Sequence, residues 1–414
     1  MYIGYKRTQR SLRGASQAQA EAAWSKRHEE FAERIFNLAV DLKGLYVKTA
    51  QFVGTRSDIF PEPYTRSLSR LQDRVPPRDP AIIRKTIERE LGQPVSRLFA
   101  HFNDEPVAAA SLAQVHRAEL PDGRAVAVKV QYPEIANLVR LDVRNLRMLS
   151  GLIARRERNF DYRAIVNEIA TQVPLELDFV REAELTRRVG ANLAGRDGLV
   201  VPTVVTELVT KRVLVTEFIE GRKLVEAGMF SGKPAEGARI AGVLAAAFGQ
   251  QVLLDGLFQA DPHPGNILLL LDGRIALLDF GLTKELTAKK RLAFARLVLS
   301  AAERNLPRVL AAFAELGLKT KSESPAEIFP LLDLFFAQRD PAQVGAIHRE
   351  RTRSTLRQNP VEALPSDLIL FGRVIGLLRG VCSSLGAPLS PIQMLRPFAE
   401  RALAAEGQAT LPAP

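Results

Sequence analysis

The spacing of apolar residues alternates along this chain between the period of a helix and that of a β-strand. Between residues 17 and 50, Trp24, Phe31, Ile35, Leu38 and Leu42 recur at intervals of three, four or seven. Such intervals put side chains on one face of a helix, so we expect a long helix with a single apolar face. Prolines between 76 and 80 break the pattern, and a short helix is expected over residues 81–91.

Strand patterns begin near residue 99. Residues 111–120 and 124–130 flank the turn Pro121-Asp122-Gly123, which predicts two antiparallel strands, and residues 213–218 predict another. From residue 235 onward the pattern is helical, except that two apolar runs flank Asp272-Gly273, a typical hairpin turn. The sequence therefore predicts an α+β protein with a mostly helical carboxyl-terminal part.

Residues with metal and acid–base chemistry lie around this predicted hairpin. The run Asp261-Pro262-His263-Pro264-Gly265-Asn266 precedes it, and Asp279-Phe280-Gly281 follows it. In a kinase with this layout, Asp261 would meet the acceptor, while Asn266 and Asp279 would bind the Mg2+ that bridges the ATP phosphates. A lone Asp-Phe-Gly would be weak evidence, but both metal ligands at this spacing favour a nucleotide site.

The upstream part of such a site can also be found. Lys129 is the charged residue within the apolar strand pattern 126–130, and it matches the kinase lysine that pairs with the α and β phosphates. Taken alone, it would also fit a strand edge with its ammonium in water. Glu182, in a helical pattern 53 residues later, is a candidate partner for Lys129; the alternative is a solvated helix carboxylate. This long separation implies inserted helices over residues 132–171.

Two further segments are candidates for holding the nucleotide. The stretch expected to cover the phosphates contains no glycine; it includes Ala108, Ala109, Ala110 and Ser111. Alanine does not readily adopt the positive φ angles open to glycine, so we expect this loop to hold phosphates in a different geometry. Downstream, Glu217 and Ile219 occupy the position of a hinge whose backbone contacts adenine; a polar strand edge is the alternative.

Together these segments resemble the UbiB-like (AarF-type) family of atypical kinases, and the resemblance covers most of the chain. It is carried by the following segments: Ala108 to Ser111 with Gln114-Val115-His116, the strand of Lys129, Glu176-Leu177-Asp178-Phe179 with Glu182, the segments of Asp261 and Asp279, and Lys48-Thr49-Ala50-Gln51 followed by Thr55-Arg56-Ser57-Asp58. Two positions depart from the family's usual pattern: Ala50 replaces a glycine and Gln259 replaces a histidine. Gln259 can form hydrogen bonds but cannot titrate.

The resemblance implies a protein-kinase-like, two-lobed α+β fold with a family-specific helical extension at the amino terminus. The expected organisation is an extension covering the active site over residues 1–98, an N-lobe with a helical insertion over 99–220, a C-lobe over 221–406 and a flexible tail over 407–414. Lys48 and Gln51 would project from the extension toward the nucleotide. ATP and Mg2+ are the implied cofactors.

The implied function is that of an Mg2+-dependent atypical kinase or ATPase that supports ubiquinone or other isoprenoid-lipid metabolism. No Ala-Pro-Glu follows Asp279-Phe280-Gly281, so the peptide-binding platform of a protein kinase is not expected. Two alternatives stay open. One is a pseudokinase scaffold that uses nucleotide only to set its conformation, and the other is a small-molecule phosphotransferase.

Composition narrows the partners. With 414 residues and 46% hydrophobic content the chain can bury a large core, and a single cysteine excludes an internal disulfide framework. The formal charge of +11 comes from dispersed basic residues, so no nucleic-acid partner is expected, while peripheral contact with an anionic membrane is compatible with it. Residues 240–258 and 367–385 are apolar runs that polar residues interrupt; we expect buried helices, no membrane span, and a cytoplasmic location.

Overall fold

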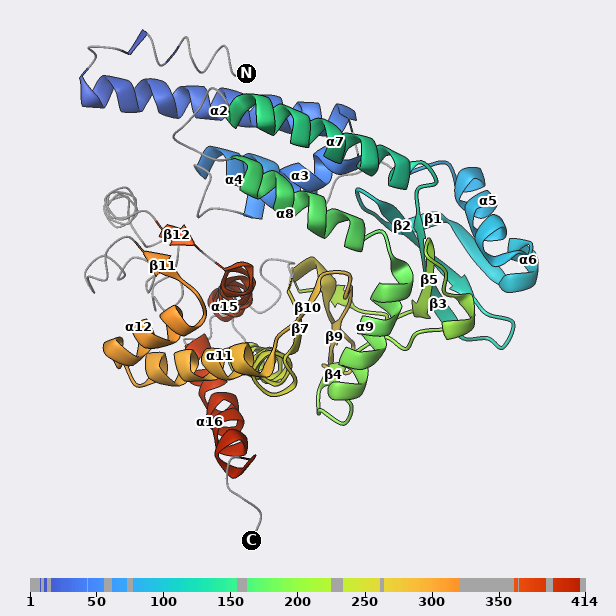
Figure 1. Ribbon diagram of the computed structural model, residues 1–414. Helices are drawn as coiled ribbons and strands as arrows, with labels where there is room; N and C mark the ends of the chain where they lie inside the picture. The colour runs from blue at the N-terminus through green and yellow to red at the C-terminus, as the bar shows by residue number, and fades with distance from the viewer. Residues whose placement is uncertain are drawn as a thin grey trace. The chain divides into compact units, whose positions relative to one another are not determined.

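Two compact units make up the computed structural model (Figure 1). The first comprises Met1–Arg181 and Val204–Phe218, and the second comprises Glu182–Thr203 and Ile219–Pro414. The structure describes residues 8, 11–12, 16–42, 44–55, 62–72, 77–154, 162–224, 234–260, 264–320, 361–363, 365–384 and 390–409. Each unit has a large hydrophobic core of its own.

A four-stranded antiparallel sheet lies at the centre of the first unit. Its strands follow the order β1 (His101–Ala109), β2 (Ala113–Glu119), β3 (Ala125–Gln131) and β5 (Val213–Glu217). Val126, Val128 and Val130 of β3 are at most 1% exposed and point into the core, because alternate side chains of a strand share a face. The strands predicted around Lys129 and over residues 213–218 are therefore confirmed.

Helices α5 (Pro80–Leu91) and α6 (Val95–Leu98) pack on this sheet through Ile83, Ile87 and Val95. The ends of α5 follow from local chemistry. The carboxylate of Asp79 accepts a hydrogen bond from the Ala81 N–H, and Gly92 ends the helix in the left-handed region at φ 71°. The short helix predicted over residues 81–91 is confirmed.

The amino-terminal helices are α2 (Gln17–Leu42), α3 (Gly44–Thr55) and α4 (Glu62–Ser69), followed by the 3-10 turn η1 (Arg70–Gln72). Their buried residues include Ala39, Val47 and Leu68. The predicted apolar face is right for Phe31, which is 5% exposed, but wrong for Leu38 and Leu42, which are 45% and 48% exposed. The buried side of α2 instead includes small residues such as Ala39.

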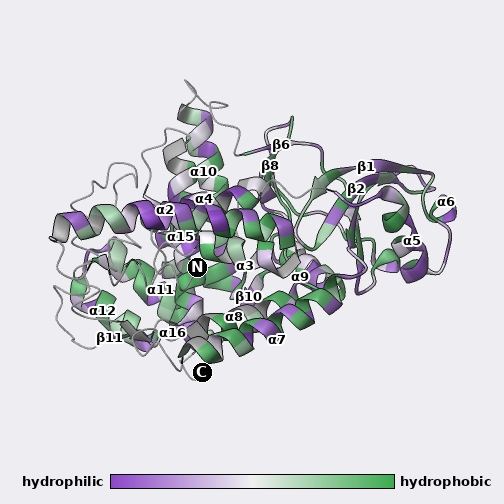
Figure 2. Cartoon of the chain, turned by 90° about the horizontal axis from the view of Figure 1, so that it is seen from above, coloured by the Kyte–Doolittle hydropathy of each residue, from purple (hydrophilic) through white to green (hydrophobic). Residues whose placement is uncertain are grey.

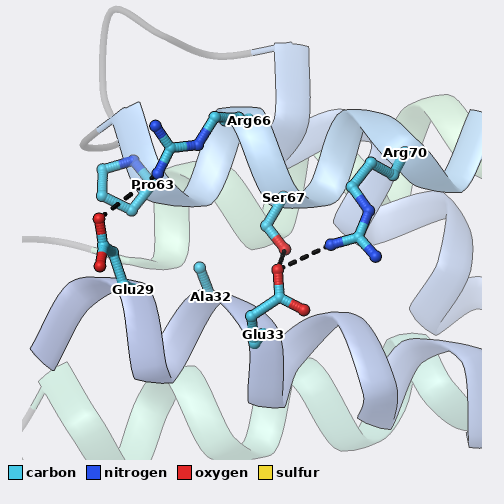
Figure 3. A pocket seen from close by; sticks show the side chains of 7 residues that line it. All are labelled: Glu29, Ala32, Glu33, Pro63, Arg66, Ser67 and Arg70. Carbon is cyan, nitrogen blue, oxygen red and sulfur yellow. Dashed lines mark hydrogen bonds and ion pairs between the residues drawn. The ribbon is translucent and has the colours of Figure 1, made fainter. Parts of the chain in front are cut away.

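Ion pairs join α2 to α4 and to the following turn η1 beside a pocket of about 420 Å3 (Figure 3). Arg66 pairs with Glu29, and Glu33 accepts hydrogen bonds at 2.7 Å from both Ser67 Oγ and Arg70 Nη1. The charged side chains are largely exposed, so each pair contributes little to stability and mainly fixes how the two helices align.

Two helices follow β3 in the first unit, α7 (Ile135–Ala154) and α8 (Tyr162–Leu175). They confirm the inserted helices predicted over residues 132–171. Helix α7 contacts α8 and α3, and its Ile135 and Val139 join the core beneath the sheet (Figure 1).

The second unit is mostly helical. Helix α9 (Phe179–Asn192) enters it from the first unit, and the other helices are α10 (Pro234–Gly249), α11 (Ala288–Ala302), α12 (Leu306–Glu315), α15 (Ser366–Ser384) and α16 (Pro391–Ala409). The prediction of a buried helix over residues 367–385 is confirmed by α15, whose Phe371 is fully buried.

Residues 240–258 form more than a single helix. Helix α10 continues into the π-helical turn η3 (Gln250–Asp255), and strand β7 (Leu257–Gln259) follows. By length and composition, Ala235–Asp255 is long and apolar enough to cross a membrane, but 61% of its most apolar window is buried inside the protein. A second such segment does not occur in the described part of the chain.

Short strands complete the second unit. One sheet has the order β4 (Leu199–Val200), β9 (Ile275–Leu277), β8 (Ile267–Leu269) and β6 (Arg222–Lys223). Strand β7 pairs with β10 (Thr283–Glu285), and β11 (Lys319–Thr320) pairs with β12 (Val361–Ala363). The 3-10 turn η4 (Pro264–Asn266) precedes β8 in this unit, whereas the turn η2 (Thr206–Leu208) belongs to the first unit.

Candidate nucleotide and metal site

The β8–β9 hairpin brings Asn266 and the Asp279 segment together. Ile267 pairs with Leu277, and the Leu278 N–H donates to the Asn266 carbonyl at 2.8 Å. At the far end the hairpin closes through Gly273 at φ 83°, with Asp272 Oδ1 accepting from the Arg274 N–H at 2.9 Å. A left-handed glycine after aspartate is the turn chemistry that Asp272-Gly273 predicted.

Asp279 has an unusual backbone. Its φ is 53°, and among the described residues other than glycine only Arg304 shares a positive φ. Its Oδ1 accepts a hydrogen bond from the Gly281 N–H at 3.0 Å, a local bond that makes the left-handed region accessible to aspartate. Residue 279 is exposed although Phe280 beside it is 1% exposed. An exposed residue held in this strained backbone conformation is typical of a functional position.

Gln259 holds this strained segment from inside the core. It is 1% exposed, and its Nε2 donates to the carbonyls of Leu278 at 2.7 Å and Asp279 at 2.6 Å. Its own backbone N–H donates to Oε1 of Gln251, a fully buried residue of the π turn. Sequence comparison with the family marked Gln259 as a departure but gave it no role. The sequence signal that could have indicated a buried supporting role is that Gln259 is a polar residue within the apolar run before Asp261.

Glu182 approaches the same loop from α9. It is 3% exposed, so the alternative of a solvated helix carboxylate is wrong. A side chain added at Gly281 would lie 3.2 Å from Asp279 Oδ1 and 3.3 Å from Glu182 Oε2. Two carboxylates therefore converge on the bare backbone of Gly281, and a larger residue there would push against both.

Lys129 lies in the first unit, on β3. It faces away from the buried valines of that strand, and its Nζ is 5.1 Å from the centroid of the Phe179 ring. A cation over an aromatic face is attracted by about 0.5–2 kcal/mol, depending on how far it is removed from water. Phe179 is the first residue of α9, the helix that carries Glu182 one turn later.

The glycine-free stretch forms the end of a hairpin. Ala108 and Ala109 belong to β1, and the Ala110 N–H donates to the Ala113 carbonyl at 2.8 Å to close a tight turn. The Tyr132 hydroxyl donates to the Ala110 carbonyl at 3.0 Å. Ser111 is 6% exposed. None of these residues has a positive φ, which is why alanine and serine can replace glycine here.

A buried polar network runs behind this turn, along β2. The Arg78 N–H donates to Gln114 Oε1 at 2.8 Å, Gln114 Nε2 lies 2.9 Å from His116 Nε2, and His116 Nδ1 lies 2.8 Å from the Asn103 carbonyl. This geometry fits a neutral His116 that donates from Nδ1. Burial lowers the pKa of His116, which keeps the ring neutral. Gln114 and His116 are therefore structural supports of β1 and β2.

The predicted hinge coincides with the border between the units. Strand β5 ends at Glu217, the Phe218 N–H donates to the Ala125 carbonyl at 3.0 Å, and Ile219 is the first residue of the second unit in this segment. The guanidinium carbon of Arg117 is 4.8 Å from the Phe218 ring centroid.

Three predicted site residues lie outside the described part of the structure. Asp261 is one, together with the neighbouring His263, and the side chains of Lys48 and Gln51 are the others, although their backbone belongs to α3. The described residues contain no group of three or more histidine, cysteine or acidic side chains that could hold a metal alone. Mg2+ does not need one, because it usually keeps several waters and substrate phosphates with one or two protein oxygens. Asn266 and Asp279 fit that donor set.

Known proteins share this architecture. Residues 70–313 match the model of the ABC1 atypical kinase-like domain. AarF domain-containing protein kinase 1 of Gallus gallus is 30% identical over 378 residues, covering 86% of this chain and 72% of that protein. An Rv3197–erythromycin complex from Mycobacterium tuberculosis aligns with a TM-score of 0.59 and 26% identity, covering 94% of this chain and 98% of the other.

Plant relatives are considerably longer. An aarF domain-containing protein kinase of Arabidopsis thaliana, named as chloroplastic, is 37% identical over 315 residues, which are 73% of this chain and 43% of that protein. Protein ACTIVITY OF BC1 COMPLEX KINASE 7 of the same plant, also named as chloroplastic, is 30% identical over 384 residues, 91% of this chain and 55% of that protein. The chain thus spans about half the length of these two relatives. It belongs to the ABC1 (AarF, UbiB-like) family of atypical kinase-like domains, and its fold is the mixed α+β, mostly helical kinase-like fold of that family.

Proposed function

We propose that this protein is an Mg2+-dependent atypical kinase or ATPase. Membership of a kinase-like domain family implies nucleotide binding. The observation that carries the rest is the hairpin that joins Asn266 to the strained Asp279 loop, with the buried Glu182 beside Gly281. Phosphoryl transfer needs oxygen ligands for Mg2+ and positioned charge more than it needs covalent chemistry.

The proposed roles follow the kinase order. Lys129 binds the α and β phosphates, and Glu182 orients it in the nucleotide-bound protein. Asn266 and Asp279 supply protein oxygens to Mg2+, which when bound neutralises phosphate charge. Asp261 positions the acceptor or a water molecule.

The remaining assignments concern how the nucleotide is enclosed. The proposal gives phosphate contacts to Ala108 through Ser111, adenine contacts to the backbone of Glu217 and Ile219, and a covering role to Lys48 and Gln51 of the amino-terminal extension. The same proposal divides the chain into an amino-terminal extension over residues 1–98, an N-lobe over 99–220, a C-lobe over 221–406 and a tail over 407–414.

The decisive experiment is a calorimetric titration with Mg-ATP of wild type and Asp279→Asn, repeated without Mg2+. Asp272→Asn is a matched control, because Asp272 also caps a turn by accepting the N–H two residues on, at the other end of the same hairpin. We expect Asp279→Asn to lose Mg2+-dependent affinity and Asp272→Asn to keep it. Equal affinity and equal metal dependence in Asp279→Asn and wild type would remove the metal-site assignment.

Two alternative functions can be told apart from the proposed kinase or ATPase by experiment. A pseudokinase scaffold would bind nucleotide without turnover, so phosphate release that is lost in Asp261→Ala would refute it. A small-molecule phosphotransferase would need an acceptor; the Mycobacterium relative was solved with erythromycin, which makes a macrolide a suitable first compound to test.

The proposed setting is ubiquinone or other isoprenoid-lipid metabolism, at the periphery of a membrane. The family resemblance and the basic charge of +11 support it. Deleting the gene and profiling isoprenoid quinones would test this setting, with Asp279→Asn as the rescue control. If Asp279→Asn rescued the quinone profile as completely as wild type, the pathway role would not depend on Mg-nucleotide chemistry.

A further inference from the structure

Strand β10 continues directly from the Asp279 loop. Only three residues lie between Asp279 and the strand. The register of β10 pairs Thr283 with Gln259 of β7, the residue that holds the Asp279 carbonyl. The Thr283 hydroxyl also donates to the Phe280 carbonyl at 2.7 Å. Because the loop and the strand are tied together at these points, a displacement of β10 would displace the Asp279 loop as well.

A buried carboxylate anchors this strand from the side of α15. Asp367, in the first turn of that helix, is 4% exposed. Its Oδ1 lies 3.1 Å from Lys284 Nζ of β10, and its Oδ2 accepts a hydrogen bond from Lys290 Nζ in the first turn of α11. Burial alone would raise the pKa of Asp367, but the two lysines outweigh it and hold the pKa below its usual range. The carboxylate is therefore charged at neutral pH.

The two helices at this anchor pack against each other one turn further on. Phe294 of α11 and Phe371 of α15 are fully buried, and their ring centroids are 4.7 Å apart. Each ring lies four residues after the charged residue of its own helix, Lys290 or Asp367, so it shares that residue's face. Most of α11 is hydrophobic, as its colours in Figure 2 show. Asp367 is thus a fixed point at the edge of an aromatic contact.

The other face of β10 contacts α9, the helix that carries Glu182. Successive side chains of a strand point to opposite faces, so Glu285 projects away from Lys284. Glu285 accepts two hydrogen bonds from Arg188 of α9, at 2.8 and 3.3 Å. Both side chains are exposed, so this ion pair contributes little to holding the strand. The buried carboxylate on the opposite face is the stronger anchor.

We propose that Asp367 is a positioning residue for the proposed Mg2+ ligand Asp279, acting through Lys284 and β10. Only eight residues separate Asp279 from α11, and no Ala-Pro-Glu platform follows, so a carboxylate from a helix far along the chain anchors the segment after Asp279. The positioning role rests on the proposed Mg-nucleotide function, whereas the anchoring of β10 does not.

The two lysines provide a matched pair of variants. They contact the same carboxylate from different elements, and their side chains are 35% and 45% exposed. Lys284→Met should weaken Mg-ATP binding in calorimetric titrations by about two- to thirtyfold, the range for a residue that acts on a site through its neighbours, and should leave the affinity without Mg2+ unchanged. Lys290→Met should bind Mg-ATP like wild type, because it loosens only the contact between α11 and α15. Lys284→Arg keeps a cation at the strand and should restore binding.

Hydrogen–deuterium exchange of the full chain, without nucleotide, measures the anchoring itself. We expect the amides of residues 280–286 to exchange faster in Lys284→Met and in Asp367→Asn than in wild type, and to exchange at the wild-type rate in Lys290→Met. Combining Asp367→Asn with Lys284→Met should cause no further loss of Mg-ATP affinity, because both changes remove the same link. Urea unfolding checks that each variant folds.

The possible failures can be told apart. If Lys284→Met bound Mg-ATP like wild type, or Lys290→Met lost as much affinity, Asp367 would be a link between helices and not a positioning residue. Unchanged exchange over residues 280–286 in Lys284→Met would overturn the anchoring, whatever the protein does with nucleotide. Failure of wild type to bind Mg-ATP would refute the proposed function and with it the positioning role, and the exchange rates would still decide whether Asp367 anchors β10.

Discussion

The side chain of Gln259 provides a quantitative test of how the Asp279 loop is held. Gln259→Leu leaves an apolar side chain in the buried position but removes the amide N–H donors that reach the Leu278 and Asp279 carbonyls at 2.7 and 2.6 Å. A buried carbonyl left without a donor costs about 1–3 kcal/mol. Two terms reduce the total: water reaches the exposed residue 279, and Gln259 Oε1 is buried without a hydrogen-bond partner among the described residues, so removing it relieves a cost. We expect the free energy of unfolding to fall by about 1–3 kcal/mol.

A separate effect is expected on Mg2+-dependent nucleotide binding. The left-handed conformation of a residue with a side chain costs about 1–2 kcal/mol, and Gln259 supplies one of the contacts that hold Asp279 in it at φ 53°. Without this contact the loop relaxes and must be reordered when the metal binds. A cost of about 1–2 kcal/mol corresponds to an affinity for Mg-ATP that is about five- to thirtyfold weaker.

Two further variants separate this effect from general destabilisation. Gln250→Leu is the matched control: Gln250, which precedes Gln251 in the π turn, also makes two side-chain hydrogen bonds, with Arg196 and Asp255, and among the described residues neither of them reaches the Asp279 loop. Gln259→His restores a ring donor and the residue usual in the family. Urea unfolding gives stability, and calorimetry gives Mg-ATP affinity. If Gln259→Leu bound Mg-ATP like wild type, or Gln250→Leu lost as much affinity, the positioning role would be refuted.

Two other predictions concern the first unit. Ala109→Gly should lower stability by about 0.5–1 kcal/mol, because glycine loses more backbone freedom on folding, and it should change the ratio of ATP to ADP affinities; an unchanged ratio would count against a phosphate-facing turn. His116 has a folded pKa that burial lowers below its unfolded value of about 6.5, so its neutral form is required for folding. Stability should therefore be complete above about pH 6.5 and fall as pH drops toward the folded pKa, by up to about 1.4 kcal/mol per pH unit, and urea unfolding of His116→Phe should give a flatter pH profile.

The elements that the sequence predicted correctly are those set by local chemistry. The β8–β9 hairpin follows from two apolar runs around Asp272-Gly273, and the short helix α5 follows the break that the prolines between 76 and 80 predict. The strand of Lys129 follows from alternation alone. These signals lie within a few residues of one another, so they need no knowledge of the rest of the fold. The site segments were predicted instead from the order and spacing of kinase motifs, and the roles of their residues stay predictions.

The parts that could not be predicted depend on contacts between distant segments. Nothing local indicates that Gln251, eight residues before Gln259, accepts its N–H, or that Gln259 reaches Asp279 twenty residues on. Strand β10 was missed because Thr283-Lys284-Glu285 has no apolar alternation and is a strand only through its pairing with β7. Leu38 and Leu42 share the period of Phe31, but α2 buries its small residues instead, so periodicity alone gave the wrong side.

The departure from a glycine-rich loop is explained by how firmly the alanine turn is tied. The Tyr132 hydroxyl and N–H donate to the carbonyls of Ala110 and Leu112, and burial raises the pKa of Tyr132 to about 12, so the hydroxyl keeps its proton at neutral pH. Arg78 stacks on the Tyr132 ring at 5.0 Å, pairs with Glu134 at 2.7 Å and donates its N–H to Gln114.

A turn held in this way has little conformational freedom to lose when a ligand binds, whereas a glycine-rich loop is free before it binds and must be ordered. The motif Gln114-Val115-His116 also serves to hold this turn in one conformation. Its two polar side chains point to one face of β2 and connect β1 to the segment before α5, which fixes the strands that present the turn. Alanine at positions 108–110 and the polar network behind them therefore act together: under the proposed phosphate contacts of this turn, preorganisation replaces the flexibility of a glycine-rich loop.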